Sequence, residues 1–567
     1  MDHCIVFAFP ALSGSNLKNH TDLFAYTSGR WLINEAHEHQ QRFVEFNLDV
    51  LCRVAANQVS DSAKCVRVAK FERNYNIAFL LIMDDGREVI AKLPCPNAGP
   101  KVLMTESEVA TMKFLGSRTS IRVPGVYTWS SDAANPVGAE YIIMEKIAGI
   151  SLAEAWESMQ TADRYEVIEQ IVQMEKELAG LEFPAYGGLY LRGALSSSVP
   201  QYALSQELDP QGVFCIGPSC RRHWWDGDLD DDLQRIATGH MGPWTTLPEY
   251  ASSSVERELI QIKHSEHSIQ RDLSDFDASQ SINDYKALLD SLKSALPALS
   301  AHDPVLAVAH PTLWHTDLHL NNIFVSPEHR TTITVILDLQ STHIAPRFIQ
   351  ARFPDFLAPP TGYKAGLFAP NLRPDFDTLP PDEQAEVRDH HSRELLSKYY
   401  ETSLHRHNPP VLDAISLARP LWEPFVSAHL ACFPSSSSLA KSLVPLRDCL
   451  IRLCDGWPSS SSSSPPSLGL ADSCPYIITD AERELHATQK AEYDDRVMLA
   501  GFVQTQLLAD EAGWVPHDRW EETNRVNGEL YGMFIEATSV ELSAGEARKK
   551  WPFPPASEGE EENNETS

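Results

Sequence analysis

The sequence is poor in positive charge. Its 567 residues include 47 Lys and Arg against 78 Asp and Glu, which gives a formal net charge of −31 at pH 7. Proteins that bind nucleic acid or an anionic membrane surface meet the phosphates with clustered Lys and Arg. The composition therefore argues against both of these partners, but it leaves room for a nucleotide bound at one local site.

Long hydrophobic runs are also missing. A membrane-spanning helix needs about 18 or more apolar residues in succession, whereas the longest runs are Ile77–Met83 and Cys4–Leu12, the second interrupted by a proline. We therefore expect no membrane span. The amino terminus lacks the positive region of a secretion signal, and residues 1–30 carry only Lys18 and Arg30 as strong bases, so a mitochondrial transit peptide is not predicted either.

Paired cysteine motifs are absent as well. Ten cysteines are spread along the chain without a C-x-x-C pair, a pattern that fits reduced, mostly buried thiols in an intracellular protein. Cys215, Cys220 and His223 come nearest to a metal cluster. A second ligand pair of similar spacing is lacking, so a zinc site is not predicted.

What the sequence does contain begins with a helix and short strands. Phe43, Phe46, Val50 and Leu51 recur at helical spacing and predict an amphipathic helix over 43–54. The strands predicted after it, the second and third joined by an Asp-Gly turn as a β-hairpin, cover 66–71, 77–83 and 88–93. A helix at about 106–115 and a strand at 140–147 follow, and from Gly149 the pattern is mainly helical.

The most informative stretch runs from Leu313 to Asp338. His315, Asp317 and Asn322 give the spacing H-x-D-x-x-x-x-N, and two short strands then lead to Asp338. Phosphoryl transfer needs one carboxylate beside the attacking hydroxyl and separate oxygen ligands that hold Mg²⁺ against the phosphates. Asp317 and His315 are the candidate catalytic residues, with His315 bracing the loop. Asn322 and Asp338 are the candidate Mg²⁺ ligands, because the hairpin returns Asp338 to the loop.

Phosphoryl transfer of this kind also calls for a lysine on an upstream strand and a glutamate that pairs with it. Lys92 ends the pattern Val-Ile-Ala-Lys on the third strand. Glu108 is the preferred partner, because Met112 and Leu115 lie four and seven residues after it and place it on the inward helix face. Glu106 is the second candidate.

These parts resemble the aminoglycoside phosphotransferase family within the protein-kinase-like fold. The run from His315 to Asn322 is similar to the family's H-G-D-L-H-x-x-N, and Ile336-Leu-Asp338 to its I-D-W-E segment. The resemblance covers about 65–350 and continues more loosely to about 540. It implies an α+β, bilobal fold, with a small antiparallel sheet lobe carrying one helix and a larger, mainly helical lobe. ATP is then expected between the lobes, with adenine against the connector 143–147.

A narrower resemblance is to a fungal branch, the altered inheritance of mitochondria protein 9 type. The segments that carry it are Asp22–Trp31, Gly187–Tyr190, Phe214–Pro218 and Gly242–Trp244. This resemblance implies a mitochondrial location, and a cytoplasmic location is the alternative.

The loop expected over the phosphates departs from the family pattern. Where the family has E-G-G-F-N, this chain has Glu72-Arg-Asn-Tyr-Asn76. Glycines let backbone N–H groups approach phosphate closely, so their replacement by Arg73 and Asn74 weakens the expected clamp. Asn tolerates left-handed conformations and Arg adds a guanidinium, so both residues join Lys92 and Glu108 as candidate ATP contacts.

Two functional hypotheses follow. The first is a phosphotransferase that uses ATP and Mg²⁺ and transfers the γ-phosphate to a hydroxyl of a small molecule. The alternative is a catalytically weak or inactive kinase-like protein that supports mitochondrial maintenance through nucleotide or partner binding. Protein kinase activity is disfavoured, because no A-P-E-like segment follows Asp338. The acidic composition fits cationic acceptors, and a solvated acidic surface explains it equally well.

The domain organisation that we predict has four parts. They are an amino-terminal extension with the first helix (1–50), a small nucleotide-binding lobe (51–150), a large helical lobe (151–550) and a disordered acidic tail (551–567). The large lobe includes an aromatic-rich insertion at 185–250 and a flexible Ser/Pro loop at 458–467. The tryptophans of the insertion could stack on an acceptor, but packing against the large lobe is the preferred interpretation.

Overall fold

A computed structural model describes most of the chain. The described residues are 5–8, 23–60, 62–225, 240–427, 439, 442–457, 467–470 and 473–555. The Ser/Pro loop predicted at 458–467, except for its last residue, and the tail from 556 onward lie outside the described residues.

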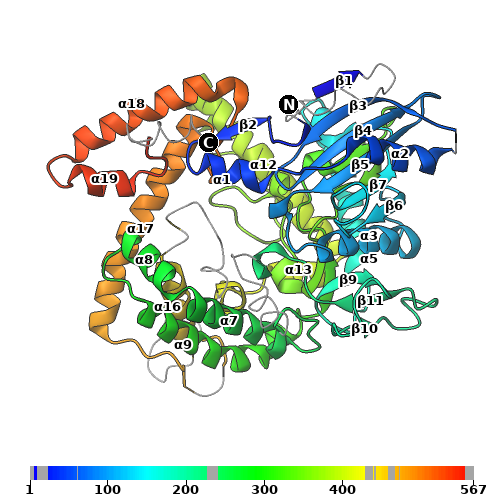
Figure 1. The fold of residues 1–567 in the computed structure, drawn as a ribbon. Coiled ribbons are helices and arrows are strands. Elements are labelled where there is room, and N and C mark those ends of the chain that lie inside the picture. The colour runs from blue at the N-terminus through cyan, green and yellow to red at the C-terminus, as the bar shows by residue number, and fades with distance from the viewer. Residues whose placement is uncertain are drawn as a thin grey trace.

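An antiparallel sheet forms the small lobe (Figure 1). Its strand order is β1-β3-β4-β5-β7-β6, and each neighbouring pair is antiparallel. The strands are β1 (Ile5–Ala8), β3 (Cys65–Glu72), β4 (Asn76–Met83), β5 (Glu88–Pro94), β6 (Val126–Ser130) and β7 (Tyr141–Glu145). The four strands predicted at 66–71, 77–83, 88–93 and 140–147 are thus confirmed.

Helices lie against this sheet on both faces. The helix predicted at about 106–115 is α3 (Leu103–Arg118), and α2 (Leu48–Val59) packs on the other face. The helix predicted over 43–54 was placed too early. It begins at Leu48, because the side chain of Asn47 accepts the backbone N–H of Val50 at 3.1 Å and caps it. A short helix that the sequence did not indicate, α1 (Glu35–Gln41), precedes it.

Strand alternation decides which side chains of β5 face the cleft between the lobes. Val89, Ala91 and Leu93 are buried in one hydrophobic cluster with α2. Successive side chains of a strand point to opposite faces of its sheet. Ile90 and Lys92 therefore point to the other face, where α3 and the large lobe lie.

The large lobe combines many helices with small sheets. The sheets are β10-β11-β9, β12-β15 and β14-β13-β8, built from β8 (Ile150–Ser151), β9 (Gly188–Leu191), β10 (Tyr202–Ala203), β11 (Phe214–Gly217), β12 (Pro311–Trp314), β13 (Ile323–Val325), β14 (Ile333–Ile336) and β15 (His343–Pro346). The described helices before residue 428 are α4 (Leu152–Trp156), α5 (Thr161–Ala179), α7 (Leu247–His264), α8 (Glu266–Phe276), α9 (Ile282–Ser300), α10 (Asp303–Leu306), α11 (Arg347–Gln350), α12 (Pro381–His407), α13 (Pro409–Ile415), α14 (Arg419–Trp422) and α15 (Pro424–Ser427).

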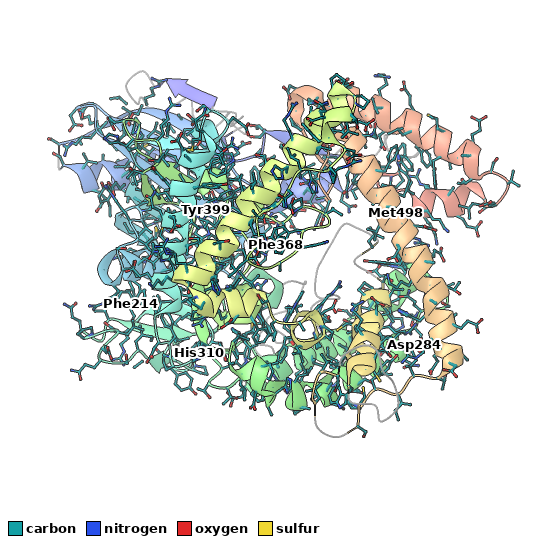
Figure 2. All side chains as sticks on the ribbon, turned by 180° about the vertical axis from the view of Figure 1, so that it is seen from behind. Phe214, Asp284, His310, Phe368, Tyr399 and Met498 are labelled. Atoms are coloured by element: carbon teal, nitrogen blue, oxygen red, sulfur yellow. The ribbon has the colours of Figure 1, made fainter. Side chains whose placement is uncertain are left out.

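Helix α5 lies at the centre of this lobe. Val167, Ile168 and Ile171 belong to the large hydrophobic core, as the helical stripe in the sequence predicted. Helix α12 packs along α5, where Tyr399 stacks on Tyr165 with ring centroids 3.9 Å apart (Figure 2). Strand β12, which precedes the predicted catalytic loop at 315–322, packs on α5 and so rests on an apolar base.

The described parts of the insertion at 185–250 contain regular secondary structure. It contains the sheet β10-β11-β9 and, after a gap at 226–239, the start of α7. Trp224 and Trp244 are 1% and 5% exposed and pack with Tyr186 and Tyr250. The tryptophans therefore fill a core, in agreement with the packing interpretation.

The carboxy-terminal part folds back on the amino-terminal segment. Strand β16 (Trp514–Pro516) pairs with β2 (Gly29–Trp31) (Figure 1). The helices of this carboxy-terminal part are α16 (Val444–Gly456), α17 (Asp480–Leu507), α18 (Trp520–Thr538) and α19 (Ala544–Lys550). The predicted tail boundary at 551 was too early. Trp551 and Phe553 are buried against α17 and α18, because their aromatic side chains complete that hydrophobic cluster.

Among the described helices, none is long and apolar enough to span a bilayer.

Candidate functional site

The catalytic loop begins where β12 ends. His315 is buried, and its two ring nitrogens connect the loop to the strand that carries Asp338. Nε2 lies 2.8 Å from the carbonyl oxygen of Leu337, and Nδ1 lies 3.2 Å from the backbone N–H of Asp317. Burial lowers the pKa of His315, so the ring is neutral and can donate on one side while it accepts on the other. His315 therefore has the geometry of a brace.

Asn322 and Asp338 lie next to each other, as the hairpin predicted. The backbone N–H of Leu337 donates to the carbonyl oxygen of Asn322 at 2.8 Å, and Ile323 pairs with Ile336 in the ladder between β13 and β14. Asp338 has a φ of 57°, a left-handed conformation that is uncommon for a residue with a side chain. The turn that follows the second strand thus aims the carboxylate into the cleft.

Lys92 joins the two lobes through carboxylates. Its Nζ lies 2.6 Å from Oε1 of Glu108 and 2.8 Å from Oδ1 of Asp338. Glu106, the second candidate for the lysine partner, instead accepts hydrogen bonds from Trp129 and Ser131. The structure therefore brings Lys92, Glu108 and Asp338 together and leaves Glu106 outside this network.

The charges in this network depend on one another. Burial alone would lower the pKa of Lys92, but Asp338 and Glu108 outweigh it and raise that pKa. Burial opposes the charge on Asp338 as well, yet Lys92 and then Arg73 lower the pKa of this carboxyl group. Burial raises the pKa of Glu108. The buried ammonium and the Asp338 carboxylate are thus held as an ion pair.

Asp317 has a different environment, since its side chain is largely accessible to solvent. Partial enclosure raises its pKa, the charge of Asp338 adds to this effect, and His319 opposes it. The amide nitrogen of Asn322 donates to the backbone carbonyl of Asp317 at 2.9 Å and fixes the loop below the carboxylate. Asp317 is therefore a solvent-accessible carboxylate, 3.6 Å from Nε2 of His319, on a loop that the Asn322 amide fixes.

A cleft of about 270 Å³ lies between the lobes. Polar residues line one part of it, including Arg73, Lys92, Glu108, Asn322 and Asp338. The remaining walls are mostly apolar and include the connector after β7; they comprise Ala78, Ile90, Met112, Met144, Ile147, Phe324 and Leu337. An apolar slot that ends in a lysine and carboxylates suits a flat base at one end and phosphates at the other.

The turn between β3 and β4 holds its shape without glycine. None of its residues from Arg73 to Tyr75 has a positive φ, and Arg73 N–H donates to the carbonyl oxygen of Asn76 at 3.0 Å. Arg73 lines the cleft, whereas Asn74 lines a second cavity. Of the two residues predicted to contact ATP from this turn, the structure thus places only Arg73 in the cleft.

The second cavity, of about 460 Å³, opens on the far side of Asp338. Asp317 and Asp338 line it together with Asn74 and His319, and three arginines that were not among the predicted site residues complete it: Arg221, Arg222 and Arg352. The adjacent pair Arg221-Arg222, in a chain with so few basic residues, was the available sequence signal for this cavity. Asp338 is common to both cavities.

Asn322 and Asp338 have the donor chemistry that suits Mg²⁺. The Oδ1 atom of Asn322 is buried without a hydrogen-bond partner, and Asp338 uses only Oδ1 for Lys92. Two hard oxygen atoms are therefore available at one point, and Mg²⁺ commonly takes one or two protein oxygens and completes its shell with phosphate and water. Among the described residues, no group of three or more His, Cys, Asp and Glu side chains could hold a metal ion by itself.

Comparison with known proteins identifies relatives along nearly the whole chain. A subtelomeric hrmA-associated cluster protein of Aspergillus fumigatus is 27% identical over 521 residues, which cover 86% of this chain and 97% of that protein. The protein named altered inheritance of mitochondria protein 9, mitochondrial, from Yarrowia lipolytica is 25% identical over 541 residues, or 91% of this chain and 88% of that protein. The protein of that name from Saccharomyces cerevisiae is 21% identical over 583 residues.

Two solved structures align with about two thirds of this chain. A ternary complex of streptomycin, ATP and APH(2")-IIa matches with a TM-score of 0.32 and 11% identity, over 69% of this chain and 97% of that one. An ethanolamine kinase of Plasmodium vivax matches with a TM-score of 0.28 and 12% identity, over 66% of this chain and 83% of that one.

The family match covers the elements that build the site. It extends from residue 74, in the turn between β3 and β4, to residue 349 in α11, and so includes Lys92, Glu108, the catalytic loop and Asp338. The bilobal fold and the resemblance on which it was predicted are both confirmed. Residues 74–349 of this chain match the model of the phosphotransferase enzyme family.

Proposed function

We propose that the chain is an ATP- and Mg²⁺-dependent phosphotransferase that transfers the γ-phosphate to a hydroxyl group of a small molecule. The observation that carries this proposal is the meeting of the two cavities at Asp338. The cleft has the lining expected for a nucleotide, and the second cavity has Asp317 in its wall. A phosphate held at Asp338 would therefore face an acceptor beside Asp317.

Different residues of the cleft would bind different parts of the nucleotide. Adenine would lie among the apolar side chains near Met144 and Ile147, and the phosphates would extend toward Lys92 and Arg73. Glu108 fixes the ammonium of Lys92 at 2.6 Å, so the cation is oriented before the nucleotide arrives. Asn322 and Asp338 would hold Mg²⁺, which neutralises negative charge on the phosphates when it is bound.

In the reaction, the oxygen of the acceptor hydroxyl forms a bond to the γ-phosphorus while the bond from that phosphorus to the β–γ bridging oxygen breaks. ADP leaves with the electron pair, and the hydroxyl proton passes to the carboxylate of Asp317. Solvent access and the hydrogen bond from Asn322 to the Asp317 backbone keep this carboxylate free and in place.

The test is a single-turnover assay of γ-labelled ATP with Mg²⁺, in which any loss of the γ-phosphate, to water or to an alcohol, is counted. Asp317→Asn should slow that loss by about 10²–10⁴-fold, while ATP affinity stays unchanged because Asp317 does not line the cleft. Asp375→Asn is the matched control, since Asp375 is exposed and pairs with Arg373 away from the site. It should behave as the natural chain.

The same assay decides between the two functional hypotheses. If the natural chain binds ATP but loses the γ-phosphate no faster than Asp317→Asn, the phosphotransferase proposal is wrong. A non-catalytic nucleotide-binding protein that supports mitochondrial maintenance would then be the better account.

We also propose a mitochondrial location. The support is that relatives from Yarrowia lipolytica and Saccharomyces cerevisiae, which match about nine-tenths of this chain, are named as mitochondrial proteins. Fractionation of the full chain with a carboxy-terminal tag tests this. The tagged protein should sediment with mitochondria and resist added protease until the membranes are lysed, and recovery only in the cytosol would contradict the proposal.

A further inference from the structure

The second cavity contains a cluster of positive side chains, although the chain as a whole is strongly acidic. The protein carries a formal net charge of −31, yet three arginines converge on this one cavity. Arg221 and Arg222 follow β11, and Arg352 follows α11, so two segments about 130 residues apart in the chain supply them. The cavity volume of about 460 Å³ lies within the range of small-molecule sites.

These arginines are held in place without carboxylate partners. Nη2 of Arg352 donates to the backbone carbonyl of Thr316 at 2.6 Å, and the guanidinium of Arg222 lies 4.2 Å from the ring centroid of Tyr75. Arg221 faces the hydroxyl of Tyr250. Within the described part of the chain, none of the three arginines forms an ion pair with a carboxylate. Their charges are thus available to a ligand.

Burial makes one of these charges unfavourable when the cavity holds only water. Enclosure lowers the pKa of Arg221, Tyr250 opposes this effect, and the nearby charge of Arg352 adds to it. A guanidinium that is removed from water without a counter-ion destabilises its surroundings until an anion neutralises it. The arginines of this cavity therefore favour an anionic ligand over a cationic one.

Polar groups in the same cavity wall are also unpartnered. His343 is 2% exposed; its Nδ1 donates to the carbonyl oxygen of Ser341 at 2.9 Å, which leaves Nε2 as an acceptor without a donor. Gln340 accepts from Asn76 through Oε1 at 2.9 Å, and its Nε2 has no partner. A ligand that offers both hydroxyl donors and anionic acceptors would satisfy these atoms.

We propose that the acceptor is an alcohol that carries an anionic group, a phosphate or a carboxylate, bound by Arg221, Arg222 and Arg352 with its hydroxyl directed toward Asp317. This inference rests on the proposed function, because it names the substrate class of the same site. Guanidinium groups match phosphate and carboxylate oxygens in geometry as well as in charge. A positively charged group placed among the three arginines would meet like charges, and the two carboxylates of the cavity, Asp317 and Asp338, already have roles in the proposed function.

The test uses four small alcohols that share a three-carbon frame and differ in charge. They are glycerol, glycerol 3-phosphate, glycerate and 3-amino-1,2-propanediol. Binding to the full chain is measured by calorimetry at low ionic strength, and transfer from γ-labelled ATP is measured separately. We expect the two anionic alcohols to bind at least about tenfold more tightly than glycerol, and the amine to bind no better than glycerol. The ranking of phosphate against carboxylate identifies the anionic group.

Variants assign the binding to the arginines. Arg222→Gln and Arg352→Gln should each weaken binding of the preferred anionic alcohol by about tenfold or more and leave the affinity for ATP unchanged. Two variants are used so that a folding defect in one does not decide the outcome. Arg388→Gln is the matched control, because Arg388 also stacks on an aromatic ring, that of Phe376, but lies outside both cavities. It should bind as the natural chain does.

Three outcomes would overturn the inference. They are a preference for the amine, equal binding of all four alcohols, or a loss of ATP affinity in the arginine variants as large as the loss of alcohol affinity. The last outcome would assign the arginines to the nucleotide. Failure of the proposed function is distinguishable, because anion binding that depends on the arginines would then persist without any loss of γ-phosphate.

Discussion

The cleft and the second cavity, which we call the basic cavity because Arg221, Arg222 and Arg352 line it, differ in how their charges are balanced. In the cleft, the Lys92 ammonium lies 2.6 and 2.8 Å from two carboxylates. In the basic cavity, Arg221, Arg222 and Arg352 contact a hydroxyl, a ring and a backbone carbonyl instead. The cation of the cleft is thus paired within the protein, whereas the arginines of the cavity are the groups that we propose to bind an anionic ligand.

This difference separates what is common to phosphoryl transfer from what selects an acceptor. Under the proposed function, the charge pattern of the cleft would follow from the phosphates of ATP, which are the same for every acceptor. The charge pattern of the cavity would follow from the acceptor. A domain of the phosphotransferase enzyme family can therefore keep the first and change the second.

The largest effect on the cleft is expected from Lys92→Met. Removal of the ammonium leaves Glu108 and Asp338 as buried, adjacent carboxylates, and loss of one partner from a buried pair costs about 3–5 kcal/mol. Both the free energy of unfolding and the ATP affinity should fall. Lys92→Arg keeps the charge and should retain more of the stability. Chemical denaturation and calorimetry measure the two quantities, and an unchanged stability in Lys92→Met would show that the network is not a buried ion pair.

Glu175, a buried carboxylate outside both cavities, shows what burial without a neighbouring cation does to a carboxyl group. Glu175 is 5% exposed and accepts hydrogen bonds from Tyr400, with no cation among its described partners. Burial raises the pKa of Glu175 to about 8. Because the folded pKa lies above the unfolded one, the contribution of this group to stability is complete below about pH 4.3 and is lost as the pH rises through about 8.

Glu175→Gln should therefore be more stable than the natural chain by a few kcal/mol at pH 9 and by much less at pH 4. Denaturation curves at the two pH values measure this difference. The amide can still accept from Tyr400, so the variant keeps the packing and changes the charge. An equal effect at both pH values would mean that Glu175 does not titrate as a buried group without a counter-ion.

The smallest effects are expected in the turn between β3 and β4, where neighbouring residues belong to different cavities. Arg73→Gln should weaken ATP binding by up to about tenfold, because Arg73 lines the cleft and its charge reaches Asp338. Asn74→Gly should leave ATP affinity nearly unchanged, because Asn74 lines the basic cavity. Calorimetry with ATP and Mg²⁺ compares the two, and a gain in affinity for Asn74→Gly would place the turn over the phosphates.

The cleft was predictable from sequence because its parts are encoded locally. Alternation along β5 places Lys92 opposite the residues that pack on α2, and the short hairpin between Asn322 and Asp338 returns the carboxylate to the loop. Spacing on α3 selected Glu108 over Glu106, and the contact with Lys92 is formed by Glu108. Each of these steps depends on neighbours in sequence.

The basic cavity was not predictable in the same way. It is assembled from 221–222, 340–343 and 349–352 together with the turn at 74–75, and no local pattern relates these segments. The net charge of the chain fitted a cationic acceptor, because a total over the whole surface does not show that three arginines converge at one place. The late start of α2 has a smaller cause, the capping side chain of Asn47.

The most direct test of the account is the Mg²⁺ dependence of ATP binding, measured by calorimetry on the natural chain and on Asp338→Asn. Asp338 is the residue common to both cavities, and with Asn322 it offers the unpartnered oxygens that would hold the metal. We predict that Mg²⁺ strengthens ATP binding to the natural chain and that Asp338→Asn loses most of this gain. An ATP affinity that is the same with and without Mg²⁺ in the natural chain, or a full gain in the variant, would contradict the account.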